Sequence, residues 1–575
     1  MPKKLKYLIS LVCIIINLQV KASIFPSNGI RLNYTQIMFE YNEIVGAEAY
    51  TIHIFPQTIY GDNDTSKEII INNNSLAIIV NELSFGQTYK WYYEAFNQNK
   101  KINKSDEYFF GINNCSFTNK ELFKFSATTP NTTAFENDVI FLDQLGIAIN
   151  RQGKPIWFLP QTTNTTYRNI AMSSNGTITM LQNNDCYEKD LLGNIIWHAP
   201  NDGKISGDST EHYHHDFMKL RNGHFLTSSY IFIIEKNKQD TTQLINTRYN
   251  TLIEYDMNGN VVWSWNEKNF IDTKTIQSAY NKEQKENAGT HLNSFFINEK
   301  FNQILISCRN NSRIAMIDKI TGKYVFELVG KHDTLLPKNT VNIDFSKQHA
   351  ASIITNRNIL FYNNNVDCKD TLGKIINPHV VILSVPKKNK PSKVIWDYEC
   401  SSNAFPKGIS GKEGFARELP NGNIFVCMGG ANRSFEVTKN KEIVWECFFE
   451  KFESTTNSWQ PINNYRTTTA SSLYPQYFTV NTHLAVDSID IKNNVPTLFT
   501  INNDGTEDDT YTINMIDEYK QTILFTTTSS IKNKTSFPLK ILLPKGLKPF
   551  QKVSLEVYPI NNKVYSFNKT FVIKN

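Results

Sequence analysis

The chain has 575 residues, which is too long for one hydrophobic core and predicts two to four domains. Its 40% hydrophobic and 20% charged content is that of an ordinary globular protein, and abundant Tyr, Phe, Thr and Ile favour strands over helices. The net charge of +6 is modest, and the basic residues are scattered rather than clustered, which argues against nucleic acid as a partner.

The N-terminal segment MPKKLKYLISLVCIIINLQVKAS combines a basic start, a short apolar run and small residues near Ala22. This order is typical of a signal peptide, here residues 1–22, with an uncleaved anchor as the alternative. The apolar run is short for a bilayer span, and no later segment is long and apolar enough. We therefore expect an exported protein, periplasmic or extracellular, without a membrane span after signal cleavage.

Seven cysteines follow the signal segment at wide spacings, without a CxxC or zinc-ribbon pattern. Their odd number leaves at least one thiol, and buried thiols are the default expectation. The one bridge that the spacing suggests joins Cys368 to Cys400.

Residues 24–130 alternate apolar and polar positions in short segments separated by Asn, Gly and Asp turns. The stretches FEYNEIVGAEAYTIHIF and FGQTYKWYYEAF resemble strands of fibronectin type III-like sandwiches, with Tyr89 and Trp91 as core aromatics. We expect an N-terminal β-sandwich without catalytic residues.

Residues 135–455 contain a degenerate repeat. A turn followed by apolar residues and an aromatic residue recurs six times, and the aromatic position, which we expect to pack blades together, is occupied by Trp157, Trp197, Trp263, Phe326, Trp396 and Trp445. A second hairpin type built on Asn-Gly or a close variant alternates with it, as in MKLRNGHFLTSS and RELPNGNIFVC. Two hairpins per unit and six units predict an all-β, six-bladed β-propeller.

From residue 456 the repeat is lost, and strand-like segments such as KVSLEVYPINNKVYSFNKTFVIKN follow a polar linker. Residues 456–575 are therefore expected to hold the linker and a small, sandwich-like C-terminal β-domain.

Three histidines share one position in the repeat. His215, His291 and His349 each lie seven residues before the Asn of a hairpin turn, at the start of the first strand of a unit. In a propeller the innermost strand begins beside the central channel, so these side chains are expected to converge on one channel mouth. The same offset gives Arg168 in another unit. His214 takes the place of His215 if the strand is shifted by one residue.

Hairpin geometry adds further residues to this group. The strand that returns after His291 places Arg309 opposite it, and Asn293 shares a strand face with His291. Tyr230 ends the strand opposite His215 and could line the site. A guanidinium offers a planar fork of donors to a tetrahedral oxyanion, and a neutral histidine can act as nucleophile or base. This combination fits transfer of a sulfuryl or phosphoryl group through a covalent histidine adduct.

The segments HHDFMKLRNG, THLNSFFI, ILISCRNNS, FSKQHAASIITNRNILFYNN and ARELPNGNIFV together resemble the bacterial arylsulfate sulfotransferases. The resemblance covers about residues 135–475. It implies an exported propeller enzyme that moves a sulfuryl group from an aryl sulfate to a phenol by a ping-pong route, without a nucleotide sulfate donor.

Carried over by motif, His349 matches the nucleophile and His291 the acid/base at the phenolic oxygen. Arg309, Asn293 and His215 match the groups that hold the sulfuryl oxygens. The sequence departs from the family pattern at Ala350, at the YNNN segment, and in lacking a closely spaced cysteine pair before His349.

Two other functions stay open at this point. A propeller that retained the fold without the chemistry would bind an anionic or aromatic ligand, or a protein, at the channel mouth. A metal-dependent enzyme would use His212 and His214, which share a strand face, but no carboxylate or cysteine is placed to complete a metal site. We expect no cofactor and no metal; a homodimer is an open oligomeric state.

Overall fold

The computed structural model describes residues 24–574 except 59–60, 82, 129–138, 161–164, 239, 279–288, 331–341, 344, 388–389, 402–410, 493–494, 561–562 and 564. The expected signal segment lies outside the described residues. The fold is all-β: within the described residues the helical elements are α1 (Thr273–Ser278) and the short 3-10 turns η1 (Thr65–Lys67), η2 (Ser116–Thr118), η3 (Asp143–Leu145), η4 (Glu267–Asn269), η5 (Glu299–Phe301) and η6 (Gly429–Ala431).

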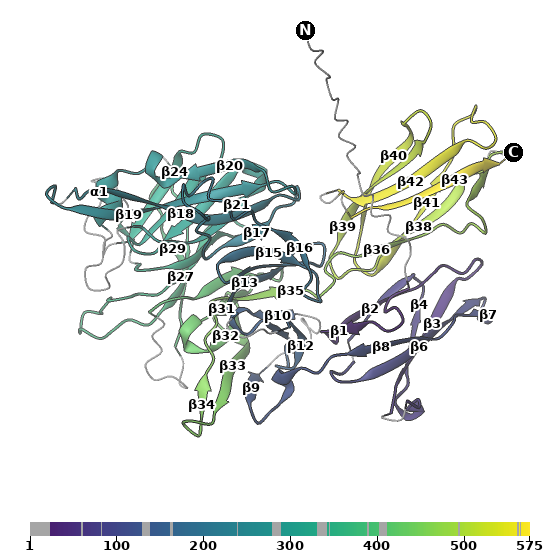
Figure 1. Cartoon of the computed structure of the whole chain (residues 1–575), viewed down its shortest axis with the longest axis horizontal. Helices are drawn as coiled ribbons and strands as arrows, with labels where there is room; N and C mark the ends of the chain where they lie inside the picture. Colours follow the sequence, from purple (N-terminus) through teal and green to yellow (C-terminus); the bar gives the residue numbers. More distant parts are fainter. Residues whose placement is uncertain are drawn as a thin grey trace, which may run out of the picture.

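Six antiparallel sheets form the blades of a six-bladed β-propeller, drawn at the left of Figure 1. The strands are given from the innermost outward. Blade 1 consists of β35 (Thr467–Ala470), β10 (Val139–Leu142), β11 (Ile147–Ile149) and β12 (Pro155–Phe158), and blade 2 of β13 (Tyr167–Met172), β14 (Ile178–Gln182), β15 (Asp185–Lys189) and β16 (Ile195–His198). Blade 3 consists of β17 (Phe217–Lys219), β18 (Phe225–Lys236), β19 (Leu244–Tyr255) and β20 (Val261–Asn266).

Blades 4 to 6 follow the same order. Blade 4 consists of β21 (Leu292–Asn298), β22 (Gln303–Cys308), β23 (Arg313–Asp318) and β24 (Tyr324–Gly330), with β25 (Asn342–Ile343) beside β24, and blade 5 of β26 (His349–Ile353), β27 (Ile359–Asn363), β28 (His379–Leu383) and β29 (Val394–Glu399). Blade 6 consists of β30 (Phe415–Glu418), β31 (Ile424–Cys427), β32 (Arg433–Val437) and β33 (Ile443–Glu453), and both β34 (Ser458–Pro461) and β9 (Phe123–Thr128) pair with β33.

The propeller is closed by strands from both ends of its sequence. β35 follows the sixth blade in the chain but pairs with β10 as the innermost strand of blade 1. Because β35 lies beyond residue 455, the propeller ends later in the chain than the loss of the repeat predicted. β9, inside the range assigned to the N-terminal domain, pairs with β33 of blade 6. Both are short strands without the repeated aromatic, so periodicity does not reveal them.

The repeated aromatic residue joins neighbouring blades. In four blades the indole N–H of the repeated Trp donates to a carbonyl in the outer turn of the next blade: Trp157 to Leu191 (2.8 Å), Trp263 to Lys319 (2.9 Å), Trp396 to Lys439 (2.8 Å) and Trp445 to Arg151 (2.8 Å). A buried indole usually finds such a partner. For these four residues, the expectation that the repeated aromatic packs blades together is confirmed.

Two sheets precede the propeller. One has the order β1 (Arg31–Leu32), β8 (Tyr108–Ile112), β6 (Thr88–Asn97), β3 (Ala49–Pro56) and β4 (Ile69–Asn73), with β7 (Lys100–Lys104) beside β6; the other pairs β2 (Ile37–Glu40) with β5 (Ala77–Val80). Trp91 is fully buried between them, with Phe39 at 5.0 Å, and Tyr89 is also buried. Their core continues into blades 1 and 2.

Two further sheets follow the propeller and enclose a separate core. Their strand orders are β36 (Phe478–Asn481), β38 (Thr497–Asn503) and β41 (Thr535–Ile541); and β37 (Ser488–Asp490), β43 (Phe567–Lys574), β42 (Lys552–Pro559), β39 (Asp509–Asp517) and β40 (Thr522–Ile531). They lie beside the N-terminal sheets in Figure 1, and the Ser75 hydroxyl lies 3.2 Å from that of Thr479.

All seven described cysteines are buried and none is in a disulfide. The expected Cys368–Cys400 bridge is therefore wrong. The two thiols point to different local carbonyls, that of Cys368 to Val366 (3.6 Å) and that of Cys400 to Tyr398 (3.9 Å).

Candidate active site

Three histidines stand where the innermost strands of neighbouring blades begin. His215 lies two residues before β17 of blade 3, His291 directly precedes β21 of blade 4, and His349 is the first residue of β26 in blade 5. These are the positions that counting from the hairpin turns predicts. Because these strands are neighbours around the channel, the three side chains start from the same end of it.

The backbone bends sharply at this level. His215 has a φ of 58° and His291 a φ of 60°, and in blade 5 the left-handed residue is Ala350, at 54°. The pairing of the innermost strand slips at the same level, between Leu292 and Ser294 and after His349. Bulges re-aim side chains, and non-glycine residues at positive φ concentrate at functional sites. The local strain thus coincides with the histidine positions.

His214, His215 and His291 form a chain of ring nitrogens. His214 Nε2 lies 3.2 Å from the Ser229 carbonyl, His214 Nδ1 lies 2.6 Å from His215 Nδ1, and His215 Nε2 lies 3.2 Å from His291 Nε2. Burial lowers the pKa of all three well below the ordinary value, reinforced by the Arg248 charge for His214 and His291 and by the His291 charge for His215. All three rings are therefore neutral at pH 7.

Neutral rings fix the direction of the hydrogen bonds in this chain. The Ser229 carbonyl only accepts, so His214 carries its proton on Nε2 and accepts at Nδ1. His215 must then donate from Nδ1, and His291 must donate from Nε2. Nδ1 of His291 is left with a lone pair that can take a proton, which is the property of a general base.

His349 is oriented by Asn364. The Asn364 side-chain amide donates from Nδ2 to the Glu413 carbonyl at 2.9 Å, so its Oδ1 faces His349 Nδ1 at 2.7 Å. Since that oxygen only accepts, Nδ1 of His349 carries the proton and Nε2 carries the lone pair. Burial lowers the pKa of His349 to about 3, with the Asn364 hydrogen bond opposing and the Arg309 charge assisting. His349 is thus a neutral ring with a nucleophilic nitrogen at pH 7.

Positive charges surround the histidines. The Arg309 backbone N–H donates to the His291 carbonyl at 2.8 Å, so the hairpin returns Arg309 opposite His291. Its charge lowers the pKa of His291 and of His349, and the Arg168 charge lowers that of His214 and of His215. A centre of neutral imidazoles among guanidinium groups suits an anionic substrate such as a sulfate ester.

The remaining predicted residues lie around this centre in different roles. Asn293 is fully buried, and its Nδ2 donates to the Gln348 carbonyl at 2.7 Å, which ties blade 4 to the residue before His349. The Arg168 guanidinium stacks over Tyr465 at 5.8 Å. The Tyr230 ring lies 5.3 Å from that of His214.

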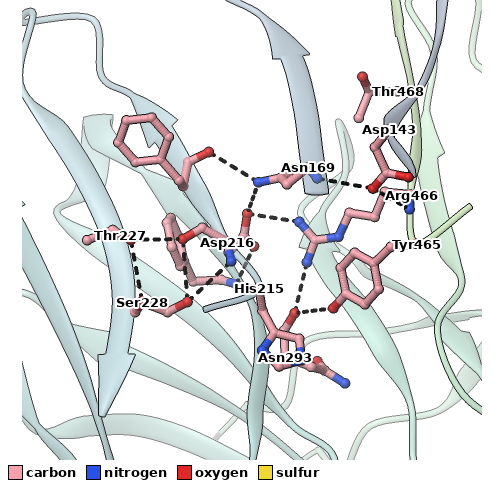
Figure 2. Close-up of polar contacts among 12 residues, drawn as sticks. Asp143, Asn169, His215, Asp216, Thr227, Ser228, Asn293, Tyr465, Arg466 and Thr468 are labelled. Atoms are coloured by element: carbon pink, nitrogen blue, oxygen red, sulfur yellow. Dashed lines mark hydrogen bonds and ion pairs between the residues drawn. The ribbon is translucent and has the colours of Figure 1, made fainter. Parts of the chain in front are cut away.

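Counting from turns missed Arg466, Tyr465, Asn364 and Arg248. Arg466 lies beneath the histidines, where it donates to Asp216 Oδ1 and to the Asn293 carbonyl, both at 2.8 Å. Asp216 Oδ1 also accepts from Asn169 Nδ2 at 2.7 Å, and Figure 2 shows the three side chains converging. In the sequence, Arg466 lies in a segment that was interpreted as a linker. The structure shows that β35 follows it directly.

A cavity of about 330 Å³ is bordered by Arg466 and Asp216. It is bounded by residues of several innermost strands, among them Ala171, Met218, Ser352, Ala416 and Thr468. Arg466 and Asp216 are also joined by an ion pair of 2.8 Å.

The lowered pKa of His349 predicts a pH-dependent stability. The folded-state pKa of about 3 lies below the unfolded value of about 6.5, so between these pH values the unfolded chain binds a proton that the folded chain does not. Stability falls as the pH drops through this window. At pH 5 this residue is expected to cost about 2 kcal/mol relative to pH 7.

The measurement is the free energy of unfolding of wild type and His349→Gln at pH 7 and pH 5. The difference between the two proteins should shift by about 2 kcal/mol in favour of the variant at pH 5. An unchanged difference would mean that His349 is protonated in the folded protein at pH 5.

Within the described residues no group of three or more His, Cys, Asp or Glu side chains is arranged to hold a metal ion. In the same part of the chain, no helix has the length and apolar character required to cross a bilayer.

Comparisons with known proteins bear on the family. No curated protein matches the chain. Similar solved structures include a protein of unknown function from Bacteroides caccae (13% identity, 54% of this chain and 93% of that chain, TM-score 0.34) and virginiamycin B lyase from Staphylococcus aureus (10%, 78% and 99%, 0.27). The propeller domain of Myceliophteria thermophila Cps50 is also similar (10%, 55% and 88%, 0.29). At these TM-scores the likeness carries no argument.

The family model for arylsulfotransferase (ASST) matches residues 124–472, from β9 to just beyond β35. The match therefore spans the whole propeller with both closing strands, and it includes all the histidines described above. The chain belongs to the arylsulfotransferase family.

Proposed function

We propose that the protein transfers a sulfuryl group from an aryl sulfate to a phenol by a ping-pong route through a sulfohistidine at His349. The observation that carries the proposal is the Asn364–His349 hydrogen bond, which leaves the lone pair on Nε2 of a neutral, buried ring. A histidine acts as a nucleophile only in this protonation state.

In the first half-reaction, His349 Nε2 attacks the sulfur, the S–N bond forms and the S–O(aryl) bond breaks. The electron pair of the broken bond stays on the aryl oxygen. The Nδ1 proton remains on the ring beside Asn364 Oδ1, so the adduct is an N-sulfonated imidazolium, which is a good leaving group. The guanidinium of Arg309 is suited to hold the sulfuryl oxygens.

In the second half-reaction, the oxygen of an acceptor phenol attacks the sulfur and the S–N bond breaks, which returns the electron pair to Nε2. The phenolic proton passes to Nδ1 of His291, whose Nε2–H is held by His215. Release of that proton to solvent, and uptake of one proton by the first phenolate, balance the reaction. No cofactor takes part in either step.

We also propose that the mature protein is exported, to the periplasm or beyond. The basis is the order of basic, apolar and small residues in segment 1–22. Fractionation of a cell that expresses the full chain, together with N-terminal sequencing of the product, tests this part.

The test uses purified protein and 4-nitrophenyl sulfate without an acceptor. We expect a burst of one nitrophenolate per enzyme, and a tryptic peptide containing His349 that carries one SO₃ group after an alkaline quench. Addition of a phenol should discharge the peptide and yield the new aryl sulfate. A propeller that only binds its ligand would show neither burst nor modified peptide, and modification of another residue would contradict the assignment of His349.

A further inference from the structure

The hairpin formed by β18 and β19 is much longer than its counterparts. Each strand has 12 residues, whereas β14 and β15 have 5 each and β22 and β23 have 6 each. The first residues of β18, up to Thr227, pair with the innermost strand β17, which begins at Phe217. Beyond them, the Tyr230 carbonyl of β18 lies 3.2 Å from His212 Nδ1. The rest of the hairpin therefore extends past the level of the histidines.

The two faces of this extension differ. On one face Ile231, Ile233 and Tyr249 pack against Ile271 and Ile276 of the segment that contains α1. Side chains alternate along a strand, so Tyr230 and Phe232 share the other face. Phe232 pairs with Arg248 across the hairpin and is 37% exposed. One face is structural, and the other presents aromatic rings and a cation.

The second face is a continuous ring surface. The Tyr230 ring lies 4.8 Å from that of His212 and 5.1 Å from that of Phe232, and the Arg248 guanidinium lies 3.8 Å above the Tyr230 ring. A cation at this distance is held over the ring face by its quadrupole. Flat apolar rings with a fixed positive charge are complementary to a phenolate or an aryl sulfate.

This surface is continuous with the histidine chain. The rings of Tyr230 and His214 lie 5.3 Å apart, His214 is hydrogen-bonded to His215, and His215 contacts His291. Among the charged groups, Arg248 lowers the pKa of His291 the most, and Arg309 lowers the pKa of His349 the most. Arg309 thus lies near both the nucleophile and the proposed base, and Arg248 adds a second cation near the base.

The departing aryl oxygen needs a stabilising charge. Neutral imidazoles have no strongly acidic proton for an aryl oxygen that departs with an electron pair. A guanidinium stays charged at every relevant pH and stabilises the developing phenolate without a proton transfer.

We propose that the face of Tyr230, Phe232 and Arg248 is the aryl subsite, and that Arg248 stabilises the phenolate oxygen as the S–O bond breaks or forms. This inference rests on the proposed function. The substrate class is a phenol or aryl sulfate whose ring lies against the hairpin. The phenolate leaves as the anion and takes its proton from solvent, while its sulfuryl group stays on His349.

The test compares Arg248→Met with wild type over donors of graded leaving ability. In a ping-pong reaction, kcat/KM for the donor reports the first half-reaction alone. Loss of one electrostatic donor typically lowers a rate by about 10²-fold or more. We expect a loss of about 100-fold with phenyl sulfate, whose phenolate is basic, and of less than about 10-fold with 4-nitrophenyl sulfate, whose phenolate is already stable.

The matched control is Arg357→Met, an exposed arginine in a hairpin turn that lies 4.9 Å above the Phe301 ring. It should leave kcat/KM unchanged for every donor. Arg248→Lys should recover part of the phenyl sulfate activity, and Phe232→Ala should raise KM for aryl donors without changing the dependence on the leaving group.

An equal loss for all donors with Arg248→Met, or none, would overturn the aryl subsite while wild type still transfers sulfuryl groups. Failure of wild type to transfer from any donor would instead overturn the proposed function. The two failures are therefore distinguishable in the same assay.

Discussion

Replacement of His349 by alanine is expected to abolish sulfuryl transfer, with a fall in kcat/KM of at least about 10⁴-fold, because no other group supplies the covalent intermediate. The side chain is 3% exposed and its Nε2 carries the lone pair, so the substitution removes the nucleophile rather than a surface contact. The measurement is nitrophenolate release from 4-nitrophenyl sulfate, with the burst amplitude determined separately.

His224→Ala is the matched control. His224 follows the turn between β17 and β18, at the far end of blade 3, and its Nδ1 lies 2.8 Å from Glu254. It should retain wild-type kinetics. Retention of the burst by His349→Ala would exclude His349 as the nucleophile.

A companion variant separates the nucleophile from its orientation. Asn364→Leu removes the acceptor for the Nδ1 proton and leaves the ring of His349 in place. The ring can then adopt the wrong tautomer, which predicts a lower burst rate with an unchanged burst amplitude. Asn364→Asp restores an acceptor and should recover most of the rate, a pattern that a purely structural role would not produce.

The repeat was readable from the sequence because each blade repeats the same turn chemistry. The Asn-Gly turns and the recurring Trp fix strand starts and outer strands, and the spacing to His215, His291 and His349 follows from them. Arg309 could be placed because antiparallel pairing relates it to His291. Local rules thus sufficed for residues within one hairpin.

Residues that reach the site from outside the regular hairpin were not readable. Arg466 directly precedes the closing strand β35, Asn364 lies in a loop, and Arg248 lies in the long hairpin of blade 3. The placement of these residues depends on how the propeller closes, on the course of a loop and on the length of one hairpin. The repeat pattern of the sequence contains none of this information. The Cys368–Cys400 expectation failed for a related reason, since spacing carries no information on thiol direction.

Arg466→Met is expected to lower the free energy of unfolding of the propeller by about 3–5 kcal/mol, because it leaves the buried Asp216 carboxylate without its cation. Burial opposes the charge of Arg466, but Asp216 outweighs this cost and raises the pKa of the guanidinium. The same guanidinium bonds the Asn293 carbonyl, so its loss also loosens blade 4 beside His291. Urea unfolding followed by tryptophan fluorescence measures the first effect, and donor kcat/KM the second.

Arg151→Met provides the comparison, since Arg151 forms a similarly buried pair with Glu436 (2.6 Å), which also accepts from Asn421 in the hairpin turn of blade 6, at the other end of the blades from the histidines. Both variants should lose stability, and only Arg466→Met should also lose activity at a temperature where it remains folded. The double variant Asp216→Asn with Arg466→Met should regain part of the stability, because it removes the uncompensated charge. An equal loss of activity in both arginine variants would mean that Arg466 acts on the site only through the stability of the propeller.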